Sequence, residues 1–179
     1  FMVNCVAPYL LTESLLPQMK QHTPARIVLV NSGLYTRGLS DPATTPSGKN
    51  FSPLKAYAAS KQASVFHMIE WAKQLEGSGI TVNAVHPGVI QTGLGDAPHL
   101  LGRVVKWMKR LMRKPAYGAL APCRVALDPA LEGVNGHYFY EQKDVDLSEK
   151  VLEPARQAAW QQWTQDFLQK PIEVKPPSS

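Results

Sequence analysis

The chain has 179 residues and a mass of 19.8 kDa, which suits one domain or one part of a larger domain. Its composition, 44% hydrophobic and 18% charged residues, is typical of a globular protein and excludes intrinsic disorder except at the ends. Two cysteines, Cys5 and Cys123, provide neither a disulfide framework nor a zinc-binding pattern, so we expect no metal site and favour a reducing compartment.

The beginning of the chain suggests a piece of a longer protein. The first residue is Phe1, and the first ten residues already have the pattern of the middle of a helix. The sequence shows no signal peptide and no apolar window of about 18 residues that would predict a membrane-spanning helix.

The net charge of +5 comes from one segment. Residues 103–114 contain six basic residues and no acid, which leaves 13 basic and 14 acidic residues elsewhere. Apolar residues recur at helical spacing through 100–112, so an amphipathic basic helix is predicted. This confined charge argues against a nucleic-acid partner. Three interpretations remain open: a solvated surface helix, a flap over a substrate pocket, or peripheral contact of residues 100–114 with an anionic membrane.

Hydrophobic periodicity predicts alternating helices and strands. Short apolar runs predict strands buried on both faces at 26–30 and 80–86, and a third strand is predicted at 136–140. Such alternation is typical of an α/β fold with a parallel sheet covered on both sides. The other segments are helices at 1–20, 54–76, 116–127 and 148–168, an irregular region at 36–53, and a flexible tail at 171–179.

Polar residues follow the two buried strands, where ligands bind in parallel sheets. The first strand is followed by Asn31 and Ser32, and Tyr57 and Lys61 open the next helix. A spacing of four residues puts the phenol and the ammonium on one helix face. Because an ammonium favours the phenolate form, such a pair suits proton transfer near neutral pH.

These motifs, in this order, resemble the short-chain dehydrogenase/reductase family, and within it the retinol-dehydrogenase-like branch. The resemblance covers the chain from its first residue to about Tyr140 and implies a Rossmann-like three-layer αβα fold. Residues 1–170 would form the C-terminal portion of one such domain, without the N-terminal glycine-rich cofactor motif. The segments that carry the resemblance are Val3-Asn4 with Leu10-Leu11-Thr12, Arg26 to Ser32, Tyr57-Ala58-Ala59-Ser60-Lys61, and Val82 to Gly88.

The resemblance implies a role for each matching residue. Tyr57 would exchange the proton with the substrate oxygen, and Lys61 would assist it and hold the nicotinamide ribose. Ser32 would bind the substrate carbonyl, and Asn4 would complete a proton relay. The nicotinamide end of the cofactor would contact Pro87, Gly88, Val89 and Thr92, and the substrate pocket would include Gly33 and Leu34 beside Ser32.

The implied activity is hydride transfer between NADP or NAD and a carbonyl or alcohol, with NADP slightly favoured. The apolar residues of 93–112 suggest a hydrophobic substrate such as a retinoid, a steroid or another lipid-like molecule. By resemblance we also expect a homodimer or tetramer and a cytoplasmic location, with or without membrane attachment. The alternative is a truncated, inactive family member that acts as a scaffold or a regulatory subunit.

Overall fold

A computed structural model describes residues 1–48, 51–90 and 115–169. Thr92, the predicted basic helix at 100–114 and the predicted tail at 171–179 lie outside the described residues. None of the described helices is long and apolar enough to cross a membrane.

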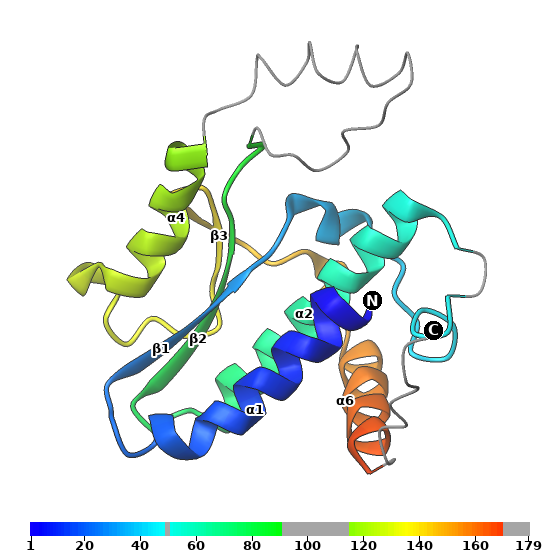
Figure 1. The fold of residues 1–179 in the computed structure, drawn as a ribbon, viewed down its shortest axis with the longest axis horizontal. Helices are drawn as coiled ribbons and strands as arrows, with labels where there is room; N and C mark the ends of the chain where they lie inside the picture. Colours follow the sequence, from blue (N-terminus) through cyan, green and yellow to red (C-terminus); the bar gives the residue numbers. More distant parts are fainter. Residues whose placement is uncertain (49–50, 91–114, 170–179) are drawn as a thin grey trace, which may run out of the picture.

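The described residues form one four-stranded sheet with the strand order β1-β2-β3-β4 (Figure 1). The first three strands run parallel, in a register that places Val30 beside Val85 and His86 beside Tyr140, and β4 is antiparallel to β3. The strands are β1 (Ala25–Val30), β2 (Ile80–His86), β3 (Tyr138–Tyr140) and β4 (Lys143–Val145).

Helices cover both faces of this sheet (Figure 1). Helices α1 and α2 lie against one face, α4 lies against the other, and α6 packs on the outer side of α2. The helical segments are a π-helical turn at Met2–Val6, α1 (Ala7–Met19), a 3-10 turn at Gly33–Arg37, α2 (Pro53–Gln74), α4 (Pro115–Leu127), a 3-10 turn at Pro129–Leu131, α5 (Glu149–Leu152) and α6 (Pro154–Leu168). The predicted three-layer α/β fold is therefore confirmed.

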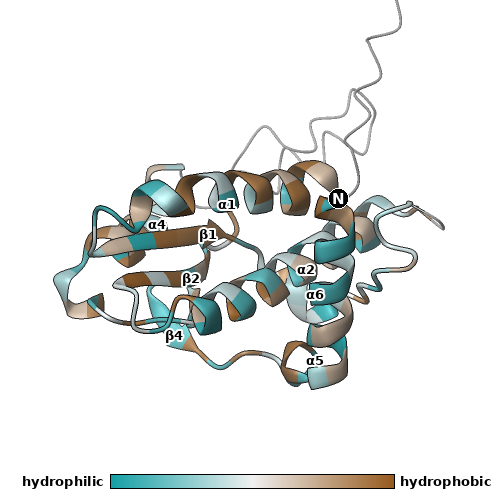
Figure 2. Ribbon diagram, turned by 90° about the horizontal axis from the view of Figure 1, so that it is seen from below, coloured by the Kyte–Doolittle hydropathy of each residue, from teal (hydrophilic) through white to brown (hydrophobic). Residues whose placement is uncertain are grey.

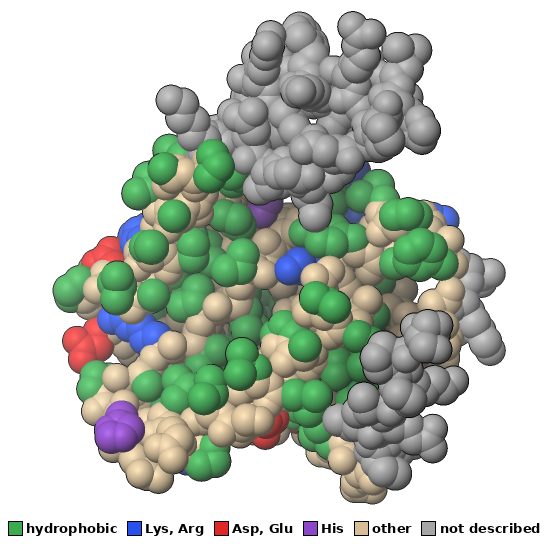
Figure 3. Space-filling view, in the orientation of Figure 1, with side chains coloured by type: hydrophobic (Ala, Val, Ile, Leu, Met, Phe, Trp, Pro, Cys, Tyr) green, Lys and Arg blue, Asp and Glu red, His purple; other side chains and the backbone are tan. Residues whose placement is uncertain are grey.

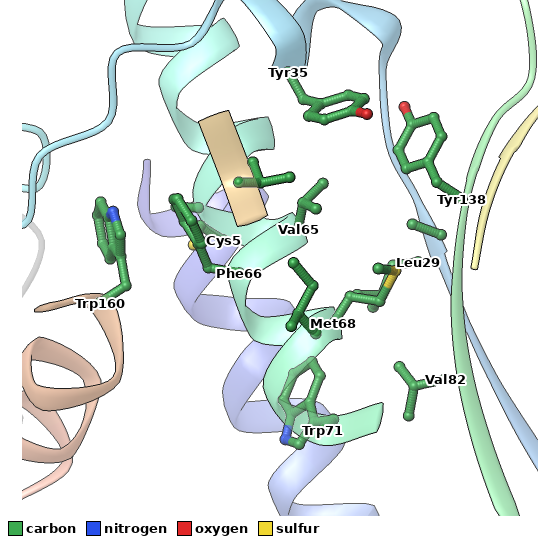
Figure 4. Close-up of a cluster of buried hydrophobic side chains, with 14 of the residues drawn as sticks. Cys5, Leu29, Tyr35, Val65, Phe66, Met68, Trp71, Val82, Tyr138 and Trp160 are labelled. Atoms are coloured by element: carbon green, nitrogen blue, oxygen red, sulfur yellow. The ribbon is translucent and has the colours of Figure 1, made fainter. Parts of the chain in front are cut away.

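Side-chain alternation along β2 creates a core on each side of the sheet. Val82 and Ala84 join the large cluster that packs against α2, whereas Val85 joins a smaller cluster beneath α4. In the larger cluster, Figure 4 shows Trp71 and Met68 of α2 lying beside the strands. Burial on both faces explains why apolar residues predominate in β2, in which Asn83 is buried as well.

The prediction that residues 26–30 are buried on both faces is wrong. Within β1, Leu29 is buried, whereas Val30 is 55% exposed and the residues before Leu29 are half-buried. Among the described residues only β2 pairs with β1, so one edge of β1 has no neighbouring strand.

Two other predictions need correction. The helix predicted at 148–168 is divided into α5 and α6, because Pro154 has no N–H and keeps Glu153 out of the helical conformation, with φ −65° and ψ 114°. Strand β4 was not predicted, because its residues are exposed and largely charged and lack an apolar pattern (Figure 2). The sheet thus ends in a polar edge strand rather than at β3.

Candidate active site

The carboxyl ends of the three parallel strands meet at one edge of the sheet. The residues predicted to contact the substrate, among them Ser32 and Gly33, lie at this edge. Gly33, just after β1, lies against two rings at the ends of β2 and β3. A methyl group added to Gly33 would lie 3.4 Å from Cδ2 of His86 and 3.5 Å from Cε2 of Tyr140. Those two rings pack edge to face with centroids 4.8 Å apart. Residues from three distant parts of the sequence therefore form one wall beside Ser32.

Tyr57 and Lys61 lie near the beginning of α2, one turn apart. Pro53 stands in the first turn, where a missing N–H costs no helical hydrogen bond. Lys61 Nζ lies 5.7 Å from the centroid of the Tyr57 ring and donates a 3.0 Å hydrogen bond to the carbonyl of Val30. Burial lowers the pKa of Lys61 from its ordinary value, and the nearby Cys5 opposes this effect. The structure thus brings the pair to the end of β1.

Asn31 connects the end of β1 to α2. Its Nδ2 donates to the Lys61 carbonyl at 3.0 Å, and its Oδ1 accepts from the Ser32 N–H at 2.6 Å. Its backbone N–H also donates to the carbonyl of Val85 at 2.8 Å, which extends the pairing of β1 with β2. Sequence reasoning gave Asn31 no role in the site, although a buried amide directly after an apolar strand was the signal.

Ser32 is buried beside Gly33, at the start of the 3-10 turn. Its Oγ accepts a 3.3 Å hydrogen bond from the backbone N–H of Leu34. The hydroxyl therefore caps this turn, as serines after strands commonly do. Capping uses one lone pair of the oxygen and leaves the hydroxyl hydrogen available as a donor to a substrate oxygen.

Asn4 lies in the π-helical turn before α1 and faces α2. Its Nδ2 is 3.4 Å from Oγ of Ser60, whose hydroxyl donates to the Tyr57 carbonyl at 2.7 Å. This side chain thus contacts Ser60 of α2. Ser60 lies within one helical turn of both Tyr57 and Lys61, and the role of Asn4 in a relay stays a prediction.

Pro87, Gly88 and Val89 follow β2, at the same edge of the sheet. Gly88 has φ +87°, a left-handed conformation that favours glycine, and Val89 is exposed. Burial lowers the pKa of the preceding His86, while Glu141 and the Asn31 backbone act in the opposite direction. In this turn Gly88 is buried and Pro87 is half-buried, and Thr92 lies outside the described residues.

The segment after the 3-10 turn packs onto α2 next to the tyrosine. A methyl group added to Gly38 would lie 2.7 Å from the carbonyl oxygen of Ala58 and 2.7 Å from Cβ of Gln62. Ser40 then fixes the segment, because its N–H and its hydroxyl both donate to Oε1 of Gln62, at 2.9 and 2.7 Å. The beginning of the region predicted to be irregular is therefore anchored to the helix that carries Tyr57.

A strand end with a serine, a Tyr-x-x-x-Lys helix and a Pro-Gly turn now meet at one edge of a parallel sheet. The family model described as short chain dehydrogenase matches residues 1–98, which is more than half of the chain. The chain belongs to the short-chain dehydrogenase family. The predicted retinol-dehydrogenase-like branch is confirmed as well, since the chain is 35% identical to retinol dehydrogenase 14 from Mus musculus over 159 residues.

Two solved structures have a fold similar to that of this chain. The 3-alpha-hydroxysteroid dehydrogenase of Pseudomonas sp. B-0831, complexed with NADH, aligns with a TM-score of 0.62 at 20% identity. The alignment covers 86% of this chain and 66% of that one. A structure from Beutenbergia cavernae with bound NADP aligns with a TM-score of 0.55 at 26% identity, covering 78% of this chain and 53% of that one.

The chain spans about half the length of the curated relatives that it matches. The alignment with mouse retinol dehydrogenase 14 covers 86% of this chain but 47% of the relative.

Proposed function

We propose that this protein is an NAD(P)-dependent oxidoreductase that transfers a hydride between the nicotinamide ring and a hydrophobic carbonyl or alcohol. The observation that carries the proposal is the position of Tyr57 and Lys61. Helix α2 presents them one turn apart, and Lys61 is hydrogen-bonded to the end of the strand that leads into Ser32. Membership of the family and of the retinol-dehydrogenase-like branch supports this reading.

The residues present fit the nicotinamide end of such a cofactor. An ammonium beside a phenol can hold the ribose hydroxyls, and the left-handed turn at Gly88 follows β2 at the same edge of the sheet. When bound, the cofactor supplies or accepts the hydride. The glycine-rich cradle that would hold the pyrophosphate has no counterpart in this sequence. NADP is slightly favoured over NAD, in keeping with the NADP-containing relative at 26% identity.

The protein groups would divide the work at the substrate oxygen. In carbonyl reduction, the Tyr57 hydroxyl gives its proton to the oxygen, and the Ser32 hydroxyl donates a hydrogen bond that holds this oxygen in place. The Lys61 ammonium stabilises the tyrosine oxygen as the proton leaves. Asn4, which contacts α2 through Ser60, would support the resupply of the proton from water.

A hydrophobic substrate suits the apolar character of the chain around the site. Val89 lies exposed at the strand ends, and residues 93–112, which follow it in sequence, are rich in apolar side chains. The name of the mouse relative, a retinol dehydrogenase, points to the same substrate class. Substrates would be retinoid-, steroid- or lipid-like alcohols and their carbonyl forms.

Two finer proposals concern partners and location. Residues 100–114 would attach the protein peripherally to an anionic membrane surface, because they combine six basic residues with an apolar stripe. A homodimer or tetramer would cover apolar side chains that α1 exposes, among them Leu11 and Leu15, on a face rich in such side chains (Figure 3). The location would be cytoplasmic, at or near a membrane.

Oxidation of NADPH and NADH with a panel of aldehydes and ketones tests the proposed function. Two proteins should be compared: the 179-residue chain, and a chimera in which the first half of mouse retinol dehydrogenase 14 precedes Phe1. Tyr57→Phe should reduce the turnover of the chimera by about 100-fold or more. The matched control, Tyr117→Phe on α4, should leave turnover unchanged. No cofactor binding and no activity in either protein would reject the proposal and favour a scaffold.

A further inference from the structure

Glu141 occupies a backbone conformation that glutamate rarely adopts. Its φ of 53° makes it the non-glycine residue with a positive φ in the part of the chain that the structure describes. It is the first residue of the two-residue loop between β3 and β4, where Tyr140 pairs with Lys143. Glycine is the favoured residue at such a position, so a glutamate here strains the hairpin. Backbone strain that persists beside a functional site indicates that the Glu141 side chain has a function there.

The Glu141 side chain lies against the Pro87–Gly88 turn. A Cβ added to Gly88 would lie 2.7 Å from Oε1 of Glu141 and 3.3 Å from its Cγ. The backbone makes a second connection, because the Glu141 N–H donates to the His86 carbonyl at 2.7 Å. The glutamate therefore contacts the chain on both sides of Pro87, and the missing Cβ of Gly88 leaves the room that its side chain fills.

The hairpin itself has other supports. Arg124 of α4 donates from Nη1 to the Gln142 carbonyl, and β3 and β4 pair over three residue pairs. A glycine at position 141 would serve the hairpin as well or better, since it would relieve the positive φ. The glutamate side chain is thus not required to form the loop.

We propose that Glu141 is a positioning residue, whose side chain holds the Pro87–Gly88 turn in the shape that receives the nicotinamide end of the cofactor. The cofactor part of this inference rests on the proposed function, whereas the control of the turn does not. Gly88 has the widest backbone freedom in the turn, and contact with the glutamate removes part of that freedom. Less conformational entropy of the turn is then lost when the cofactor binds.

The test compares Glu141→Gly with Glu141→Gln and with the matched control Gln142→Gly, the other residue of the same loop. Amide hydrogen exchange of Val89 and Ile90 is measured in the 179-residue chain, and thermal unfolding is measured in parallel. In Glu141→Gly the exchange should become about tenfold faster or more, while the unfolding midpoint stays equal or rises. Glu141→Gln, which keeps the length of the side chain, and Gln142→Gly should both stay within about threefold of the parent exchange rate.

Cofactor binding provides the second measurement, made by NADPH fluorescence in the chimera described above. Glu141→Gly should weaken NADPH binding by about tenfold, and Glu141→Gln should restore most of the loss. Unchanged exchange in Glu141→Gly, or a glutamine variant as loose as the glycine variant, overturns the proposal. If the parent chimera binds no NADPH but Glu141→Gly still loosens the turn, the proposed function fails while the positioning of the turn by Glu141 stands.

Discussion

The side chain of Asn31 joins the residue expected to hold the substrate oxygen to the residue expected to assist proton transfer. Its amide accepts from the N–H of Ser32 at 2.6 Å and donates to the carbonyl of Lys61 at 3.0 Å. The two bonds fix the distance between a strand end and a helix that meet only in the folded chain. Asn31 is a positioning residue in this sense.

Replacing Asn31 with alanine should therefore damage both stability and turnover. The substitution leaves the buried N–H of Ser32 without its partner, which costs about 1 to 3 kcal/mol of unfolding free energy, and the Lys61 carbonyl keeps only its bond within α2. Asn31→Asp keeps the acceptor for Ser32 but loses the donor to Lys61, so it should rescue only part of the loss. Urea unfolding measures the stability, and hydride transfer in the chimera measures the turnover. An Asn31→Ala variant as stable as the parent would contradict this account.

The close packing of Gly38 on α2 predicts a second sensitive position. In Gly38→Ala the new methyl group would lie 2.7 Å from the carbonyl oxygen of Ala58, so α2 or the segment must shift. Overpacking of this kind costs about 1 to 3 kcal/mol, and the shift would move the first turns of α2, where Tyr57 lies. Thermal unfolding and the turnover of the chimera should both fall. Ser47→Ala, at an exposed position of the same segment, is the control and should change neither.

His67 makes stability depend on pH through a buried contact far from the strand ends. Its Nε2 lies 3.0 Å from Thr164 Oγ1 of α6, its Nδ1 lies 3.7 Å from Cys5 Sγ, and its ring packs on Tyr9. Burial lowers the pKa of His67 to about 4 from an ordinary value of 6.5. Below pH 6.5 the unfolded chain therefore binds a proton that the folded chain binds only near pH 4.

The sign of the effect follows directly: the unfolding free energy falls as the pH drops from 6.5 to about 4, and this contribution then levels off. The loss over that interval should be about 3 kcal/mol. Urea unfolding at a series of pH values measures it. His67→Gln should flatten the dependence, whereas the control His22→Gln, at an exposed position, should keep it. A parent protein equally stable at pH 7 and pH 4 would refute the prediction.

Local patterns were sufficient for most of the fold. The apolar residues of β2 and the 3.6-residue periodicity of α2 indicate burial directly, because the side chains that must leave water recur at the spacing of a strand or a helix. The candidate catalytic residues follow from local patterns too, since Ser32 comes directly after a strand, where ligands bind, and Tyr57 and Lys61 are four residues apart on one helix. The errors lie where a pattern is weak or ambiguous. β4 is polar, and the apolar run of β1 could not reveal that, within the described residues, β1 pairs with a strand on one edge only.

The sequence by itself determined the alternation of helices and strands, the family, and the residues expected to carry the chemistry, because each depends on neighbours in the chain. Only the tertiary structure decided which distant groups support those residues. Asn31 reaching Lys61, Gln62 holding Ser40, and Glu141 filling the space beside Gly88 all depend on contacts between segments that are 22 to 53 residues apart. No local periodicity records such contacts, since they form when helices and strands pack against one another.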